Sequence, residues 1–273
     1  MGGRLLPALA ARHEVLALAR RPVDGFETVV ADLSGEVVLP PGIDAVVHLA
    51  QSQRYREWPD GAGDVYAVNV HATFQLLEQA RRAGVRHFVQ ASTGAVYAPS
   101  PAPLREDDPV APDGFYARSR YAAEVLAAGY ADQLPTVILR PFFIYGPEQT
   151  GMLVPTLAGR VVAGEEITVQ GDPGIAITPI HVDDAVRAVA AAVELEQPAV
   201  INVAGAETVT MTGLVQLLAE LAGREPRIRH ADGSAPDLVA DIARMRTVLG
   251  IEPAVSLREG LAGVVSRLAD RAP

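Results

Sequence analysis

The chain lacks two residue types on which protein chemistry often relies. It contains no cysteine, so disulfide bonds and thiolate metal sites are excluded, and cysteine usage gives no information about the redox compartment. It also contains no lysine, because all 23 residues counted as Lys+Arg are arginines. An arginine at a position that ordinarily carries a lysine can therefore reflect this bias of the whole chain.

Long apolar runs and excess positive charge are missing as well. No run approaches the ~20 apolar residues of a membrane span, and no charged-then-apolar leader opens the chain. The formal net charge is -10 and the pI is about 5.1, with no basic stripe to replace the counterions of a nucleic acid. No metal-ligand cluster stands out. We expect a cytoplasmic protein whose partner is a small molecule, with no nucleic acid and no membrane.

What is present is an alternation of strand-like and helix-like segments. The chain has 273 residues, of which 49% are hydrophobic, enough to bury the core of one large α/β unit or of a domain with a smaller lobe. We predict a first domain over residues 1–150 and a mainly C-terminal lobe over residues 151–273, from which some segments return to the sheet.

The segment from Ala91 to Tyr130 places groups suited to proton transfer near one another. Ser92 and Thr93 follow an apolar run, and after a Pro-rich loop Tyr116 opens a predicted helix. Arg120 follows four residues later, so both side chains lie on one helix face. A fixed cation favours the ionised form of a phenol, and a hydroxyl could share a substrate oxygen with it. Taken singly, such a tyrosine is more often a packing residue and such an arginine a solvated charge.

The sequence STGAVY followed by YARSR resembles the active site of the extended short-chain dehydrogenase/reductases, the family of NAD(P)-dependent epimerases and dehydratases. The resemblance implies a Rossmann-like, doubly wound parallel sheet with a small C-terminal substrate lobe. It also implies that Thr93 is the catalytic hydroxyl, with Ser92 beside it, and that Tyr116 is the general acid/base. The family's lysine falls on Arg120, which is a departure from the pattern.

The same resemblance implies cofactor-binding residues and shows what is missing around them. Gly2 matches the last glycine of the family's glycine turn, whereas the first two glycines and the first central strand are absent. The chain start could lie upstream, the sheet could have closed up, or another chain could supply the strand. The other implied cofactor-binding residues are Arg20, Arg21, Asp32, Leu33, Leu49 and Ala50.

The cofactor expected from this pattern is NAD or NADP. Arg20 and Arg21 favour NADP, because arginine accommodates a 2′-phosphate. Without most of the glycine turn, the main binding site for the pyrophosphate is missing, so we expect weak dinucleotide binding or none.

The substrate-binding positions implied by the family carry apolar residues. Phe143 replaces an asparagine, and Ile177 replaces the arginine of a diphosphate-binding segment. Arg140 and Arg244 remain as cations that could bind a phosphate. From these positions we expect a substrate other than the usual nucleotide-diphosphate sugar.

Two functional hypotheses follow. The first is an NAD(P)-dependent epimerase, dehydratase or ketoreductase that acts at a hydroxyl or carbonyl carbon of a small molecule. The second is a repurposed scaffold, either a cofactor-independent lyase, isomerase or cyclase acting on an apolar metabolite, or a binding protein. In the family, the helices over residues 66–83 and around Tyr116 pack against a second subunit, which implies a homodimer.

Overall fold

The computed structural model describes residues 1–270, and these residues form two compact units. Unit 1 comprises residues 1–98, 109–140 and 186–201, and unit 2 comprises the remaining residues, namely 99–108, 141–185 and the chain from 202 onward. The main change of unit lies between Arg140 and Pro141, near the predicted division at residue 150, and each unit contains a segment that returns from the other half of the chain.

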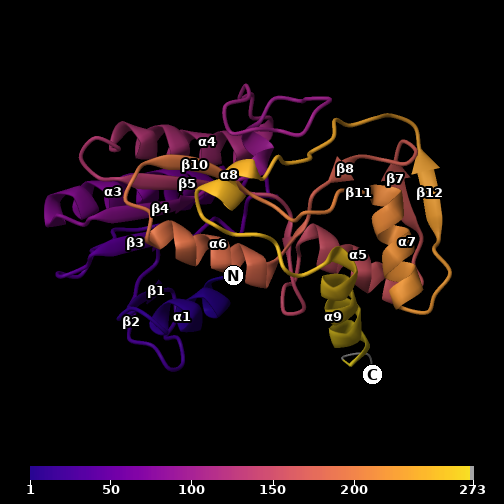
Figure 1. Ribbon diagram of the computed structural model, residues 1–273, viewed down its shortest axis with the longest axis horizontal. Coiled ribbons are helices and arrows are strands. Elements are labelled where there is room, and N and C mark those ends of the chain that lie inside the picture. The colour runs from indigo at the N-terminus through magenta and orange to yellow at the C-terminus, as the bar shows by residue number, and fades with distance from the viewer. Residues whose placement is uncertain (271–273) are drawn as a thin grey trace. The chain divides into compact units, whose positions relative to one another are not determined.

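Unit 1 carries the larger sheet and the helices around it (Figure 1). Its helical segments are α1 (Gly2–Ala10), α2 (Ala62–Tyr66), the π-helical η1 (Ala67–His71), α3 (Ala72–Ala83), the 3-10 turn η2 (Gly94–Val96) and α4 (Gly114–Gly129). Its strands are β1 (Ala17–Ala19), β2 (Thr28–Val30), β3 (Ala45–His48), β4 (His87–Ala91) and β5 (Thr136–Pro141). Helix α6 (Val182–Val193) and strand β10 (Ala199–Val203) each span a boundary between the units.

The strands of unit 1 form two separate sheets. The larger has the order β10-β5-β4-β3, in which β3, β4 and β5 are parallel. Strands β1 and β2 form a parallel pair of their own. Among residues 1–270, no strand joins β1 to β3, so each has one edge without a strand partner. The prediction of a Rossmann-like α/β fold with parallel strands is confirmed.

The hydrophobic pattern of the sequence explains how α3 covers the sheet. Leu76, Leu77 and Ala80 recur at helical spacing and pack in a buried cluster with Phe88 of β4 and Ile138 of β5. The helix ends at Gly84, which adopts a left-handed conformation with φ of 71°. Helix α4 packs beside α3, with Ala127 in the same cluster.

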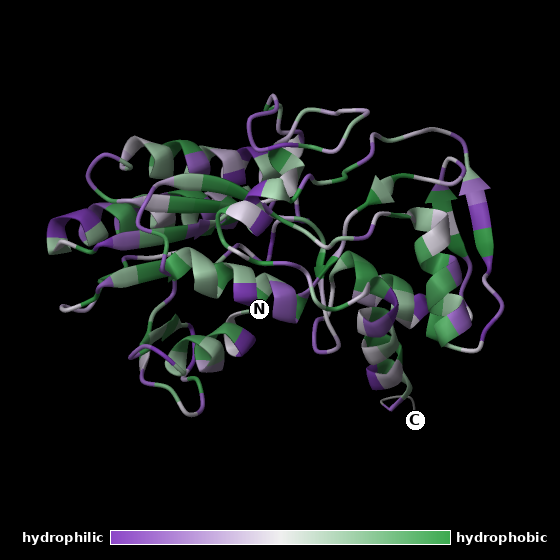
Figure 2. Ribbon diagram, in the orientation of Figure 1, coloured by the Kyte–Doolittle hydropathy of each residue, from purple (hydrophilic) through white to green (hydrophobic). Residues whose placement is uncertain are grey.

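Unit 2 is built from short strand pairs and helices around a second apolar core. Its elements are β6 (Ile144–Tyr145), α5 (Leu153–Val162), β7 (Ile167–Gln170), β8 (Ala176–Ile177), β9 (Ile180–His181), β11 (Val209–Thr210), α7 (Met211–Leu221), β12 (Ile228–Ala231), α8 (Ala243–Thr247) and α9 (Leu257–Ala269). The pairs are β6 with β9, β7 with β12 and β8 with β11. Figure 2 shows hydrophobic residues along α5 and α7, both of which contribute to this core.

Residues 1–270 contain neither a membrane-spanning helix nor a metal-binding cluster. No helix within residues 1–270 has the length and apolar character needed to cross a membrane. Within the same residues, no group of three or more His, Asp or Glu side chains is arranged to hold a metal ion.

Candidate active site

Tyr116 lies in the first turn of α4, as the sequence predicts for a residue that opens a helix. Asp113 caps this helix, and its carboxylate accepts from the Gly114 amide at 2.8 Å. The Tyr116 ring is partly buried, and its hydroxyl donates to Gln51 Oε1 at 3.1 Å. Since Gln51 follows the β3 strand closely, this contact holds the phenol at the carboxyl end of the sheet, where polar ligands bind in such folds.

Arg120 is buried one turn beyond Tyr116, with a side chain that is 1% exposed. Its Nη1 donates to the carbonyl of Ala50 at 3.1 Å, and its Nη2 donates to the carbonyl of Ala91. The guanidinium therefore bridges the carboxyl ends of β3 and β4. Burial lowers the pKa of Arg120, while the nearby Tyr116 and Glu124 side chains oppose that shift. An arginine side chain stays protonated even when it is buried, so Arg120 supplies a fixed positive charge.

Ser92 is buried, and its hydroxyl donates to Glu124 Oε1. Glu124 lies on α4 one turn beyond Arg120 and also accepts from Arg140, whose Nη2 is 2.7 Å from Glu124 Oε2. Both members of this ion pair are about 95% buried, with side chains 5% and 4% exposed. In this structure the Ser92 hydroxyl is therefore used to hold α4 to β4.

Thr93 differs from Ser92 in that it is partly exposed. Its hydroxyl oxygen accepts from the Ala95 amide at 3.2 Å and so caps the 3-10 turn η2. This contact uses only an oxygen lone pair, so the hydroxyl proton remains to be donated. At the end of the same turn, the Tyr97 ring lies under the guanidinium of Arg140, with 4.6 Å from Cζ to the ring centroid.

Asn69, within the π-helical η1, ties three segments around Tyr116. Its side chain accepts from the Ser52 amide at 2.9 Å and donates to Ser119 Oγ at 2.9 Å. Ser119 Oγ in turn donates to the main-chain carbonyl of Tyr116 at 2.7 Å. Single-turn π-helices are frequent at functional sites. The fully buried amide of Asn69 thus fixes the loop after β3 and the start of α4 relative to each other.

The expected cofactor residues lie around α1, β1 and β2. A Cβ added at Gly2 or Gly3 would meet nothing within 4 Å, so the first amides of α1 are open to an approaching anion. Arg20 and Arg21 are exposed after β1. Asp32 accepts from the amide and hydroxyl of Ser34, each at 2.9 Å, and these bonds, together with the charge of Arg20, lower its pKa.

Leu33, Leu49 and Ala50 are partly buried in unit 1. Leu33 packs at the margin of the apolar cluster beneath the sheet, and the carbonyl of Ala50 is taken by Arg120. Together with the open amides of α1 and the exposed arginines, these residues fit a dinucleotide with respect to its phosphates and ribose.

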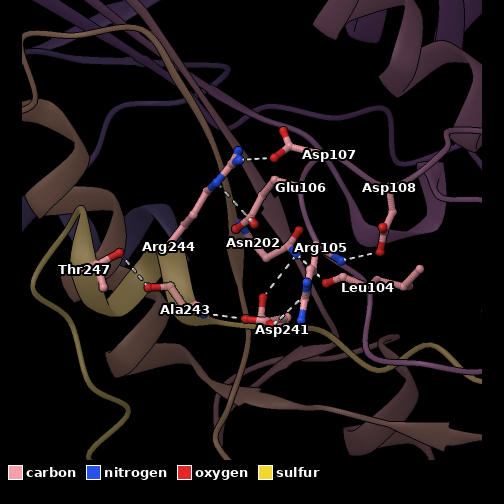
Figure 3. A network of polar contacts seen from close by, with 10 residues as sticks. All are labelled: Leu104, Arg105, Glu106, Asp107, Asp108, Asn202, Asp241, Ala243, Arg244 and Thr247. Atoms are coloured by element: carbon pink, nitrogen blue, oxygen red, sulfur yellow. Dashed lines mark hydrogen bonds and ion pairs between the residues drawn. The ribbon is translucent and has the colours of Figure 1, made fainter.

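The expected substrate residues fall into different environments. Phe143 is partly buried with a φ of 45°, and Ile177 is fully buried in the core of unit 2. Arg140 is held by Glu124. Figure 3 shows that Arg244 points toward Glu106 and Asp107, with 3.7 Å between Arg244 Nε and Glu106 Oε2. Both arginines are therefore engaged by carboxylates in this structure.

The Arg244 network is anchored on a buried carboxylate. Glu106 Oε1 accepts from the Asn202 amide at 2.9 Å, and Asn202 Nδ2 donates to the carbonyl of Leu104 (Figure 3). Burial raises the pKa of Glu106, although the amide of Asn202 and the charge of Arg244 oppose it.

In unit 1 the structure brings Tyr116, Arg120 and the strand ends carrying Ala50 and Ala91 into contact. It adds residues that the sequence analysis did not single out: Gln51, Asn69, Tyr97 and Glu124. Two of these had a visible signal. Glu124 lies four residues beyond Arg120 and thus on the same helix face, and Gln51 directly follows the predicted cofactor residue Ala50.

The sequence of the chain resembles those of known proteins of one family. The family model described as NAD dependent epimerase/dehydratase matches residues 1–204. A dTDP-4-dehydro-6-deoxy-D-allose reductase of Streptomyces bikiniensis is 33% identical over 240 residues, which cover 82% of this chain and 73% of that protein. A dTDP-glucose 4,6-dehydratase of Streptomyces griseus is 32% identical over 247 residues, covering 87% and 75%.

A solved structure is similar over nearly the whole length. The structure of MoeE5 in complex with UDP-glucose and NAD superposes with a TM-score of 0.84 at 30% identity, covering 98% of this chain and 95% of that chain. The matching family model spans well over half of the sequence, and the fold of the solved structure agrees with it. The chain therefore belongs to the NAD-dependent epimerase/dehydratase family.

Proposed function

We propose that this protein is an NAD-dependent enzyme that oxidises or reduces a carbon of the sugar in a nucleotide sugar, with Tyr116 as the general acid/base. The observation that carries the proposal is the position of the Tyr116 phenol. It is partly exposed, it is held at the carboxyl end of the sheet by Gln51, and it lies one helical turn from the buried cation of Arg120.

The protein's own residues would handle the proton. Tyr116 would take the proton from a substrate hydroxyl as that carbon is oxidised, and would return it to the carbonyl oxygen in the reverse direction. Thr93 would donate its hydroxyl proton to the same substrate oxygen. When bound, the nicotinamide supplies the acceptor or donor of the hydride. The substrate oxygen would replace Gln51 as the hydrogen-bond partner of the phenol.

Arg120 would act on the proton transfer through its charge. Its guanidinium is fixed by the carbonyls of Ala50 and Ala91, so the positive field beside the phenol does not depend on a flexible side chain. Because arginine does not release its proton, Arg120 cannot relay protons as an amine could. In this proposal it supplies a fixed positive charge near the site of proton transfer and ties the loop after β3 to the end of β4.

The cofactor would lie over α1 and the ends of β1 and β2. The open amides at Gly2 and Gly3 would receive a phosphate, and Asp32 would lie near the adenosine. The relatives and the solved structure named above support NAD. NADP binding should be measured beside NAD binding, because the exposed Arg20 and Arg21 could bind a 2′-phosphate.

A nucleotide sugar is the substrate class that the named activities of the relatives support. The arginines first considered for its phosphates are both paired, Arg140 with Glu124 and Arg244 with Glu106 and Asp107. Of the two, Arg244 is more exposed, at 38%, and it could exchange the exposed Asp107 for a phosphate while it keeps the buried Glu106 as a partner.

We also propose a homodimer formed through α3 and α4. Phe74 on α3 and Val125 on α4 are 43% and 55% exposed, and they lie on the two helices for which the family resemblance implies contact with a second subunit. Light scattering after size exclusion, on the wild type and on Phe74→Asp, tests this point.

The function is tested by supplying the protein with NAD or NADP and a panel of UDP- and dTDP-sugars, and by resolving products chromatographically and by nuclear magnetic resonance. Conversion of at least one nucleotide sugar, dependent on added dinucleotide or on dinucleotide that copurifies, is the expected result. Conversion of an apolar ketone or of another metabolite in the complete absence of dinucleotide would instead support a cofactor-independent enzyme.

A further inference from the structure

Two separate ring pairs involve Tyr116 and its chain neighbour Phe115, and the proposed chemistry does not use the rings that pack against them. The centroid of the Tyr55 ring is 5.0 Å from that of Tyr116, with 44° between the planes. The ring centroids of Trp58 and Phe115 are 4.5 Å apart, and Phe115 is the residue before Tyr116. We call Tyr55, Trp58 and Phe115 the aromatic lip.

The loop that carries Tyr55 and Trp58 is tied down at both ends. Ser52 is 1% exposed; its amide donates to Asn69, and its hydroxyl donates to Asp64. At the other end, a Cβ added at Gly61 would lie 2.4 Å from the carbonyl oxygen of Arg54, so the loop closes on itself with room only for glycine. The rings are thus presented at a defined place.

Within the lip, Trp58 is exposed to solvent, while Tyr55 and Phe115 are partly buried. Trp58 is 62% exposed, and it is the only tryptophan of the chain. Covering an exposed ring is favourable by about 25 cal/mol per Å² of apolar area, so a ligand that packs on Trp58 would gain binding free energy. Arg56 lies over one face of Tyr55, with 5.2 Å from its Cζ to the ring centroid.

We propose that the aromatic lip packs against an apolar C–H surface of the sugar of the substrate, and that it favours a sugar whose C6 hydroxyl is absent, because the resulting methyl group enlarges that surface. The inference rests on the proposed function. A sugar whose oxygen meets the Tyr116 hydroxyl is only a few ångströms across, so it reaches a ring centred 5.0 Å from that of Tyr116. A hydroxyl pressed against an aromatic ring loses its water without gaining a partner, whereas a deoxygenated carbon loses nothing.

The test compares dTDP-glucose with its 6-deoxy analogue, using dTDP alone as the reference for the nucleotide. In the wild type, both sugars should change the Trp58 emission and dTDP alone should not. Calorimetry should give a lower Kd for the 6-deoxy sugar. Tyr55→Ala and Trp58→Ala should each weaken binding of the 6-deoxy sugar by about 3- to 10-fold, the range for aromatic contacts, and should reduce the preference for it.

Matched variants separate this role from folding. Tyr55→Phe and Trp58→Phe keep a ring and should retain the affinity, while Tyr66→Ala removes an exposed ring that stacks on His71 and should leave both Kd values unchanged. If the wild type binds the sugars and the two alanine variants bind them equally well, the lip inference is wrong and the proposed function stands. If the wild type binds no nucleotide sugar, both are wrong.

Discussion

Arg140 and Glu124 form a buried ion pair in which Nη2 lies 2.7 Å from Oε2. Burial alone would lower the pKa of Arg140, but the hydrogen bonds and charge of Glu124 raise it well above its ordinary value. Glu124→Gln keeps an acceptor for the Ser92 hydroxyl yet leaves the arginine as an uncompensated buried cation. We expect the free energy of unfolding to fall by about 3–5 kcal/mol in urea denaturation.

An exposed pair supplies the control for this variant. Arg258 Nη2 lies 2.8 Å from Glu220 Oε2, and the side chains of Glu220 and Arg258 are 62% and 57% exposed. Because water screens such a pair, Glu220→Gln should change the free energy of unfolding by only about 0–1 kcal/mol. An equal decrease in the free energy of unfolding for both variants would show that the buried pair stabilises the protein no more than the exposed pair does.

Arg120→Lys tests whether the arginine is adapted to this site or only reflects the absence of lysine from the chain. The guanidinium donates to the carbonyls of Ala50 and Ala91 through two separate nitrogens, whereas an ammonium carries its three donors on one nitrogen and cannot span both carbonyls in the same geometry. We expect a loss of about 1–3 kcal/mol in the free energy of unfolding, as for one buried carbonyl left without its donor. Turnover of the substrate found in the panel should fall as well. Equal or higher turnover would favour the compositional explanation.

His48 predicts how stability depends on pH. The ring is buried, its Nε2 lies 3.1 Å from Thr73 Oγ1, and burial together with the charge of Arg120 lowers its pKa to about 3. Between about pH 3 and pH 6.5 the unfolded chain binds a proton at His48 and the folded chain does not. The contribution of His48 to the free energy of unfolding is therefore complete above pH 6.5. It is lost as the pH falls toward 3, and the loss is at most about 5 kcal/mol.

The contribution of His48 is isolated by comparison with His48→Gln, which keeps a donor for Thr73 and does not titrate. Chemical denaturation from pH 4 to pH 8 should give a shallower dependence for the variant than for the wild type. Parallel curves would contradict the assignment of a neutral, buried imidazole.

The sequence predicted the parts of the site that depend on local spacing. Tyr116 and Arg120 lie one helical turn apart, as four-residue spacing requires, and Gly84 ends α3 in the left-handed conformation. The α/β fold followed from the alternation of apolar strands and amphipathic helices.

The parts that were not predicted depend on contacts between distant residues. The Ser92 hydroxyl donates to Glu124, which lies 32 residues further along the chain on α4. Arg244 was considered for a phosphate, and it meets Asp107, which is 137 residues away along the chain. Neither partner can be chosen from spacing alone, because many carboxylates are available to each arginine or hydroxyl until the chain is folded.

The role of Tyr116 is tested most directly by Tyr116→Phe, assayed on the nucleotide sugar that the wild type converts. The substitution keeps the ring against Tyr55 and removes only the hydroxyl that donates to Gln51, so the thermal stability and the Kd of the substrate should change little. The turnover rate should fall by about 10²–10⁴-fold, the usual contribution of one positioned acid/base. A variant that folds, binds and turns over at the wild-type rate would contradict the assignment of Tyr116 as the catalytic acid/base.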